Sequence, residues 1–211
     1  MGTNTLDTLV SDVYKLMKDK NSAKGVDTEA EIEKFGEAMK DLMRKEFVPS
    51  VENFSNRSGL RLSAVGKPLR QQWMGTKGYT KEKIEPKTLI KFMYGHVIEE
   101  MLLLFVRLSG HAVTDEQKLL EVGGIKGSMD CKIDGVVVDV KSTTKFGITK
   151  FQKGSLAADD TFGYIDQIKA YAHAEGDRKW AWLAMDRDSG TLAVCKYDLD
   201  DTDHPFHSMY S

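Results

Sequence analysis

The sequence predicts an α/β fold in which a central mixed β-sheet is flanked by helices, with a helical lobe at the N-terminal side. Three observations predict this class. An apolar stretch that begins at Pro86 and stops before Gly110 is long enough for a core helix. Asp134-Gly135 separates two alternating apolar runs, which is the pattern of a two-residue β-hairpin. After the long helix, the elements follow in the order three strands, helix, two strands, which is typical of a layered α/β domain.

The first part of the chain predicts two helices. Apolar residues recur at helical spacing from Thr5 to Lys20 and again from Thr28 to Phe47. The basic, glycine-containing segment 49–87 predicts irregular structure with some helix. We therefore expect a helical N-terminal lobe over 1–52 and a second domain over 53–211.

The long helix and the strands after it make up the expected core. In the helix, one stripe of apolar side chains is the expected buried face: Leu89, Met93, Val97, Met101, Leu104 and Leu108. Alternating or continuous apolar runs predict strands at Glu116 to Val122, Lys126 to Ile133, Val136 to Ser142, Trp180 to Met185 and Leu192 to Tyr197. A further helix from about Thr161 to Ala174 is expected between the third and fourth strands.

The Asp134-Gly135 turn fixes which residues lie opposite each other in the hairpin. A type I′ turn at these two positions sets Asp130 opposite Asp139, with side chains about 5 Å apart. Lys141 shares the face of Asp139, because side chains alternate along a strand. The other face of this strand is the expected core face and carries Val136, Val138 and Val140.

Two carboxylates at this separation repel each other, so a positive charge is expected beside them. The ammonium group of Lys141 offsets part of the repulsion, and a hard divalent cation such as Mg²⁺ or Mn²⁺ would offset more. Glu99 is a further candidate ligand, because it lies near the apolar edge of the long helix, one turn after Gly95. Glu100 is the alternative ligand, since helix geometry alone does not separate the two.

Composition restricts the classes of function. The chain has 211 residues and a formal net charge of −2, and its 41% hydrophobic content is that of a globular protein. No stretch has the roughly 20 apolar residues of a membrane helix, so we expect no membrane association. The start of the chain lacks the pattern of a secretion signal, and two distant cysteines do not form a metal or cluster motif, which together predict a cytoplasmic protein.

Charge is nevertheless unevenly distributed. The segment from Arg57 to Lys91 has nine basic residues against two acidic ones, and a second basic stretch runs from Lys141 to Lys153. Clustered positive charge in an otherwise acidic chain is typical of a protein that binds a polyanion along one face. Two solvated surface segments are the alternative interpretation.

The series Gly95-x-x-x-Glu99, Gly127-x-x-Asp130, Asp139-x-Lys141 and Gln167-x-x-x-Tyr171 resembles the PD-(D/E)XK nuclease superfamily, nearest its RecB and lambda-exonuclease-like branch. Order and spacing both match, over about residues 53 to 197. The resemblance implies a restriction-endonuclease-like core. The segment from Leu60 to Arg70 is also similar to the lead-in of phage and AddAB-type members, where basic and hydroxyl groups approach DNA.

The resemblance implies roles for individual residues. It implies that Glu99, Asp130, Asp139 and the backbone carbonyl of Val140 hold one or two Mg²⁺ or Mn²⁺ ions. Lys141 would orient or activate the attacking water, or stabilise the charged phosphoryl group, and Gln167 and Tyr171 would position that lysine or the DNA backbone. The expected DNA-binding residues are Arg57, Arg61, Ser63, Lys67, Arg70, Ser142, Lys145 and Tyr164. No cysteine stands near Pro68 as in iron–sulfur members, so no iron–sulfur cluster is expected.

These observations predict a metal-dependent DNA exonuclease of phage or bacterial recombination, repair or degradation, acting in the bacterial or phage-infected cell. A structure-specific or restriction-like endonuclease is one alternative, because the same core serves both activities. A non-catalytic nucleic-acid-binding module of the same fold is the other. The sequence has no nucleotide-binding loop, so any helicase activity would require a partner protein. A recombination partner and a homo-oligomer are further expectations from the resemblance.

Overall fold

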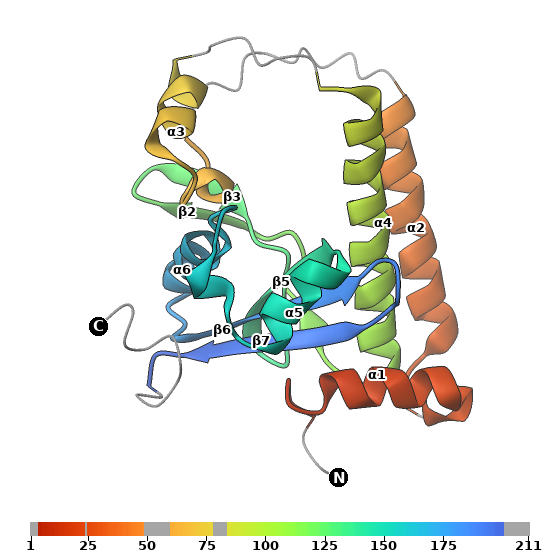
Figure 1. Ribbon diagram of the computed structural model, residues 1–211. Helices are drawn as coiled ribbons and strands as arrows, with labels where there is room; N and C mark the ends of the chain where they lie inside the picture. The colour runs from red at the N-terminus through yellow and green to blue at the C-terminus, as the bar shows by residue number, and fades with distance from the viewer. Residues whose placement is uncertain (1–3, 24, 49–59, 78–83, 201–211) are drawn as a thin grey trace. The chain divides into compact units, whose positions relative to one another are not determined.

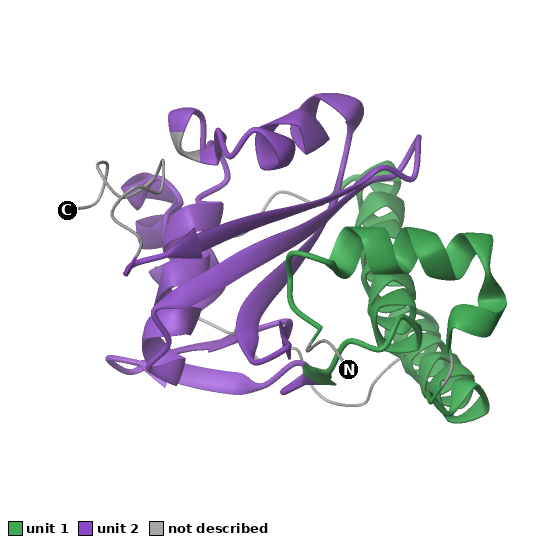
Figure 2. Cartoon of the chain, turned by 90° about the horizontal axis from the view of Figure 1, so that it is seen from below, with its two compact units in different colours: residues 1–57, 81–113 green, residues 58–80, 114–211 purple. Residues whose placement is uncertain are grey.

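The computed structural model describes residues 4–23, 25–48, 60–77 and 84–200. The chain divides into two compact units, one formed by 1–57 with 81–113 and the other by 58–80 with 114–211 (Figure 2). Each unit is built from segments that are separated in sequence. The two compact units are defined by contacts and each contains two separate segments, whereas the expected domains are two continuous segments. The division into domains over 1–52 and 53–211 therefore stays a prediction.

The first unit is helical, as the N-terminal sequence predicts. Its helices are α1 (Leu9–Lys18), the 3-10 turn η1 (Lys20–Ala23), α2 (Thr28–Phe47) and α4 (Pro86–Leu108) (Figure 1). Both α1 and α2 pack against α4. Helix α2 has the bounds that the sequence predicts, and the side chain of Asp27 caps it by accepting a hydrogen bond from the Ala30 N–H. Helix α1 begins at Leu9 rather than Thr5, and Thr8 before it makes no side-chain cap.

Helix α4 is buried mainly through its second half. The buried side chains are Ile98, Leu102, Leu103, Leu104, Val106 and Arg107. The expected stripe is therefore wrong at its start, where Leu89 is exposed. Polar contacts also join α4 and the residues after it to the other helices, since Arg107 pairs with Glu31, and the buried His111, three residues beyond the end of α4, lies 3.3 Å from Asp12. Among the described helices, none is long and apolar enough to cross a membrane.

The second unit contains a mixed β-sheet, which confirms the α/β fold class. Five strands lie in the order β1-β4-β5-β6-β7, and β2 and β3 form a separate two-stranded sheet. The strands are β1 (Val113–Thr114), β2 (Leu119–Val122), β3 (Ile125–Ser128), β4 (Cys131–Ile133), β5 (Val136–Thr143), β6 (Lys179–Asp186) and β7 (Leu192–Asp198). Strand β5 is antiparallel to β4 and parallel to β6, so the sheet is mixed as the sequence predicts.

The β4–β5 hairpin has the predicted turn and register. Asp134 and Gly135 both have positive φ, at 51° and 82°, as a type I′ turn requires. Cys131 lies opposite Val138, which is the register expected from this turn. The hairpin therefore positions the residues at its open end as the sequence predicts.

Strand β5 differs from expectation because both of its faces are buried. Val138 and Val140 are buried on one face, but Val137 and Asp139 on the other face are buried as well. Helix α6 packs against β5, and its Tyr164 contacts Lys141, which shares a face with Asp139, so α6 covers that face of the strand. Asp139 thus lies under a layer of protein instead of on an open surface.

Helices and short turns complete the second unit. They are η2 (Leu62–Ala64), α3 (Leu69–Thr76), α5 (Lys145–Gln152), η3 (Leu156–Ala158) and α6 (Tyr164–Glu175). Helices α5 and α6 pack against the central sheet. Helix α6 is the expected helix, three residues shorter at its start. Helix α5 was not predicted, and the expected strand from Lys126 to Ile133 is divided into β3 and β4.

Candidate active site

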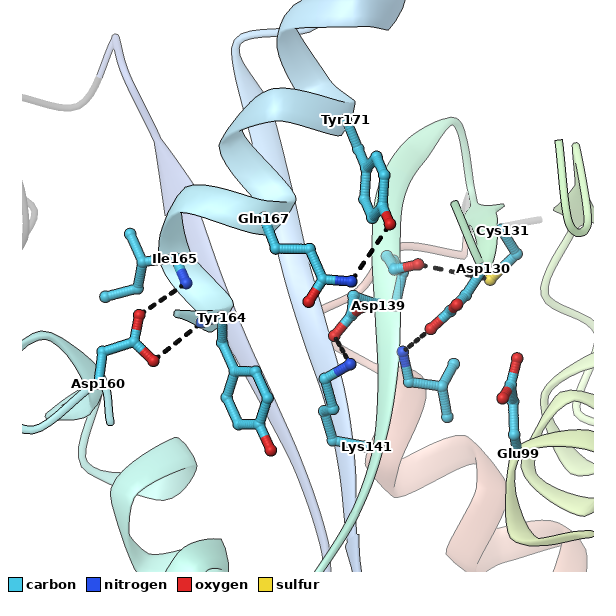
Figure 3. Close-up of polar contacts among 12 residues, drawn as sticks. Glu99, Asp130, Cys131, Asp139, Lys141, Asp160, Tyr164, Ile165, Gln167 and Tyr171 are labelled. Atoms are coloured by element: carbon cyan, nitrogen blue, oxygen red, sulfur yellow. Dashed lines mark hydrogen bonds and ion pairs between the residues drawn. The ribbon is translucent and has the colours of Figure 1, made fainter. Parts of the chain in front are cut away.

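Asp130 and Asp139 meet at the open end of the β4–β5 hairpin. Asp130 directly precedes β4, and its Oδ2 accepts a hydrogen bond from the Val140 N–H at 2.8 Å (Figure 3). Its own backbone carbonyl accepts a hydrogen bond from the Gln117 N–H at 2.8 Å, so the backbone turns away from β5 at this point. At this point the side chain of Asp130, instead of its backbone carbonyl, accepts the hydrogen bond from β5. The two carboxylates are thereby held beside the same stretch of β5.

Lys141 pairs with the buried carboxylate. Its Nζ lies 2.6 Å from Asp139 Oδ2, and Asp139 is only 2% exposed. The Lys141 Nζ also lies 5.0 Å from the centroid of the Tyr164 ring, within the range of a cation–π contact. Burial alone lowers the pKa of Lys141, but the charges of Asp139 and Asp130 outweigh burial and raise the pKa. Lys141 is therefore a cation between an acidic pair and an aromatic ring.

Helix α6 supplies the other predicted side chains. Gln167 Nε2 donates a hydrogen bond to Tyr171 Oη at 3.2 Å, as expected for residues one turn apart (Figure 3). Tyr171 is buried, and burial raises the pKa of its hydroxyl. The negative charges of Asp139 and Asp130 also raise this pKa. Gln167 and Tyr171 thus contact each other, while the ring that contacts Lys141 belongs to Tyr164. Tyr164 is predicted as a DNA-binding residue and as a weaker member of the helix face that carries Gln167 and Tyr171.

Asp160 fixes the start of α6 and was not among the predicted residues. Its two carboxylate oxygens accept hydrogen bonds from the N–H groups of Tyr164 and Ile165, each at 2.9 Å (Figure 3). This satisfies N–H groups that the first turn of a helix leaves without partners, and it holds Tyr164 in place. Asp160 lies three residues before the N-cap position, which is Gly163, so the usual sequence signal of a capping side chain does not identify it.

A backbone contact joins the start of α6 to the basic loop after η2. Gly163, with φ of 71°, lies so close to Gly66 that an added Cβ would come within 2.5 Å of the Gly66 carbonyl carbon. Lys67 follows Gly66 directly and is exposed. The loop that carries this predicted DNA-binding lysine is therefore held beside the helix that carries Tyr164.

The remaining predicted DNA-binding residues of this segment lie on both sides of that loop. Ser63 is exposed on η2, and Arg70 is exposed on α3. Arg61 is also exposed and forms a parallel bridge with Lys126 of β3. Leu62 is buried against Gly127, which anchors the segment to the small sheet. Arg57 lies outside the described residues.

Two predicted residues follow Lys141 along the chain. Ser142 is half-buried at the end of β5, and its Oγ is buried without a hydrogen-bond partner among the described residues. Lys145 is exposed at the first position of α5. The side chain of Thr144 caps this helix by accepting a hydrogen bond from the Gly147 N–H. Both predicted residues therefore extend the site toward the start of α5.

Glu99 belongs to the other compact unit. It lies on α4, where its Oε2 is 3.7 Å from His96 Nδ1, and this contact raises the pKa of the His96 imidazole. Glu100 is next to it on the same helix and is half-buried. The role of either glutamate as a ligand beside Asp130 and Asp139 stays a prediction.

The donor atoms suit a hard divalent ion. Across residues 4–23, 25–48, 60–77 and 84–200, no three histidine, cysteine or acidic side chains gather as a metal-binding group. The second unit nevertheless brings two carboxylates to the same end of one hairpin, and carboxylate and carbonyl oxygens are the ligands that Mg²⁺ and Mn²⁺ prefer. Asp130, Asp139 and the carbonyl of Val140 therefore fit part of such a site.

Comparisons with known proteins find similar solved structures, among them two crystal structures. No protein-family model and no curated protein matches the chain. One of the two similar structures is the crystal structure of LHK-Exo in complex with dAMP, which is 15% identical in sequence and has a TM-score of 0.44. The match covers 68% of this chain and 79% of the LHK-Exo chain. The other is the crystal structure of SSO0001, which is also 15% identical and has a TM-score of 0.37. The match covers 76% of this chain and 75% of the SSO0001 chain.

Proposed function

We propose that the chain is a divalent-metal-dependent deoxyribonuclease that hydrolyses phosphodiester bonds, as an exonuclease of phage or bacterial DNA recombination, repair or degradation. The observation that supports this proposal lies within one compact unit. Asp130 and Asp139 lie together at the end of one hairpin, with Lys141 2.6 Å from the buried carboxylate. A pair of carboxylates with a neighbouring cation suits chemistry at a phosphate group.

In this proposal, Asp130, Asp139 and the Val140 carbonyl hold one or two Mg²⁺ or Mn²⁺ ions, and Glu99 completes the site. A bound ion would lower the pKa of water and stabilise charge on the phosphoryl oxygens. The hydrogen bond from the Val140 N–H keeps the Asp130 carboxylate in place. Lys141 contributes a positive charge where negative charge develops in the reaction.

The neighbouring elements hold and orient the DNA in this proposal. Tyr164 limits the movement of the Lys141 ammonium by lying 5.0 Å from it, and the Gln167–Tyr171 hydrogen bond fixes the next turn of α6. The exposed Lys67 and Arg70 would bind phosphates, with Arg61, Ser63, Ser142 and Lys145 beside them. Such contacts position a nucleic acid without reading its sequence.

The experiment that tests the proposal uses purified protein with end-labelled linear single-stranded DNA, linear duplex and closed circles. Each substrate is incubated with Mg²⁺, with Mn²⁺ and with chelator, alongside the Lys141→Ala variant. Metal-dependent loss of linear DNA with circles spared, and no loss with Lys141→Ala, supports an exonuclease. Cut circles would favour the endonuclease alternative. Salt-sensitive binding without cleavage under either metal would contradict the proposal and favour a binding module.

A further inference from the structure

Phe162 is an exposed aromatic ring that is stacked on Tyr164 of the candidate active site. The two ring centroids are 5.4 Å apart and their planes differ by 20°. Phe162 is 66% exposed, whereas Tyr164 is half-buried beside Lys141. The contacts Lys141–Tyr164 and Tyr164–Phe162 therefore form a continuous path from the buried carboxylate of Asp139 to the surface.

The turn that carries Phe162 is held on both sides. Asp160 caps α6 through the N–H groups of Tyr164 and Ile165, and its own carbonyl accepts a hydrogen bond from the Gly163 N–H at 3.2 Å. The close approach of Gly66 to Gly163 fixes the other side. Because the turn is already ordered, a ligand that stacks on Phe162 would lose little free energy in ordering it.

Position and charge indicate what could stack there. Because Phe162 is mostly exposed and is stacked on Tyr164, its free face lies next to the ring that contacts Lys141 of the candidate active site. The exposed Lys67 follows the Gly66 contact and supplies positive charge beside this turn, where Asp159 is paired with Lys150 and Asp160 accepts backbone hydrogen bonds. Asp166, exposed on the first turn of α6, is a negative charge on the same side of Gly66. Aromatic rings beside basic side chains are the combination with which proteins bind single-stranded nucleic acids.

We propose that Phe162 is a stacking platform for an unpaired nucleobase of the substrate strand, next to the phosphate at the active site. The inference rests on the proposed nuclease function and names its substrate class as DNA with unpaired nucleotides at that point. Within a duplex both faces of an internal base are covered by its neighbours, so a base inside a duplex cannot lie on Phe162, whereas an unpaired base can. The stack would orient the strand relative to Lys141.

The test measures binding of two 15-nucleotide probes in chelator, where no cleavage occurs. One probe is oligothymidine and the other has the same phosphates with abasic sugars. We expect Phe162→Ala to weaken oligothymidine binding about tenfold, within the range measured for base–aromatic stacking, and to leave abasic binding unchanged. Phe162→Trp should restore the affinity, and its added fluorescence relative to the wild type should be quenched by oligothymidine but not by the abasic probe.

Phe146→Ala is the matched control. Phe146 is also an exposed phenylalanine of the same unit, 76% exposed on α5, and its ring contacts Lys150 instead of Tyr164. This variant should bind both probes like the wild type. Equal binding of oligothymidine by the wild type and Phe162→Ala, or an equal loss for both probes, would overturn the stacking inference.

Cleavage of linear DNA by the wild type in Mg²⁺ separates this result from a failure of the proposed function. If the wild type cleaves and Phe162→Ala binds oligothymidine normally, only the stacking inference fails. If the wild type neither cleaves nor binds either probe, the proposed function fails, and the inference that rests on it fails too.

Discussion

The carboxylate of Asp130 accepts a hydrogen bond from the Val140 N–H at 2.8 Å and so joins β5 beyond the last paired residue of β4. This contact gives Asp130 a structural role as well as its proposed role as a metal ligand. The two roles differ in what they require. The hydrogen bond requires only an acceptor oxygen, whereas the proposed metal site relies on the negative charge of the Asp130 carboxylate, which attracts a divalent cation more strongly than a neutral amide oxygen does.

We therefore predict different results for two substitutions of Asp130. Asp130→Asn keeps an acceptor oxygen, so its urea midpoint should match the wild type while Mg²⁺-dependent cleavage is lost. Asp130→Ala removes the acceptor and should also lower the free energy of unfolding by about 1 kcal/mol. Urea denaturation and cleavage of a labelled oligonucleotide measure the two effects. Normal cleavage by Asp130→Asn would exclude it as a metal ligand.

Lys141→Ala should abolish cleavage while DNA binding stays within about threefold of the wild type, because one lysine contributes a small part of the phosphate contacts. Lys179→Ala is the matched control. Lys179 also pairs with an aspartate from a strand, with Nζ 2.8 Å from Asp198 Oδ2, but 60% of its side chain is exposed. Gel-based cleavage and fluorescence anisotropy measure the two properties. Equal activity of the two variants would mean that the Lys141 ammonium has no part in the reaction.

Substitution of Gly163 tests the contact between α6 and the basic loop. Gly163→Ala should destabilise the fold through its positive φ and through overlap with Gly66. Gly176→Ala is the control, since Gly176 has φ of 73° but nothing within 4 Å of its added Cβ. Thermal unfolding should show Gly163→Ala less stable than Gly176→Ala by at least about 1 kcal/mol. Equal stability would show that the loop can move away from α6 at little cost.

The register of the hairpin and the pairing within α6 could be predicted because both depend on local rules. A two-residue turn sets the partners of every residue in the hairpin, and residues four apart on a helix are neighbours. These two rules account for the positions of Asp130 and Asp139 at one hairpin end and for the Gln167–Tyr171 hydrogen bond.

Features that depend on distant parts of the chain could not be predicted. Burial of Asp139 follows from β6 and α6, which come far later in the sequence. Helix α5 contains Gly147 and β-branched residues that weaken a helical pattern, and its cap and its packing on the sheet stabilise it. The contact between Gly66 and Gly163 leaves no sequence signal beyond the two glycines.

Arg61→Ala and Arg70→Ala should each weaken DNA binding and make it less dependent on salt. Each lost phosphate contact releases one fewer counterion, so the slope of log affinity against log salt should decrease by about 1. Lys196→Ala, an exposed position on β7, is the comparison. Anisotropy titrations from low to moderate salt measure the slopes. Equal slopes for Arg61→Ala, Arg70→Ala and Lys196→Ala would show that neither arginine contacts the DNA phosphates.

Glu175 makes part of the stability dependent on pH. Burial raises the pKa of its carboxyl, but hydrogen bonds from Lys118 and Lys132 outweigh burial and lower it from the ordinary value of 4.5. A carboxyl whose pKa is lowered in the folded state stabilises the fold above its unfolded pKa, and this contribution is lost as pH falls through the folded value.

Glu175→Gln should therefore have a lower urea midpoint than the wild type at pH 7. The difference between the two proteins should shrink as the pH falls below 4.5 and through the lowered pKa of the folded protein, because the carboxyl of the wild type then becomes protonated as well. A difference that stays constant across this range would assign the effect of the substitution to packing instead of charge.

The measurement that tests the central claim most directly is the cleavage rate of labelled linear DNA by the wild type and by Asp139→Asn. Both proteins are assayed in Mg²⁺ and in chelator, at a temperature where both are folded. The account predicts cleavage by the wild type in Mg²⁺ alone, and a rate at least about 1,000-fold lower for Asp139→Asn. Cleavage in chelator, or a wild-type rate for Asp139→Asn, would contradict a metal-dependent nuclease centre at the β4–β5 hairpin.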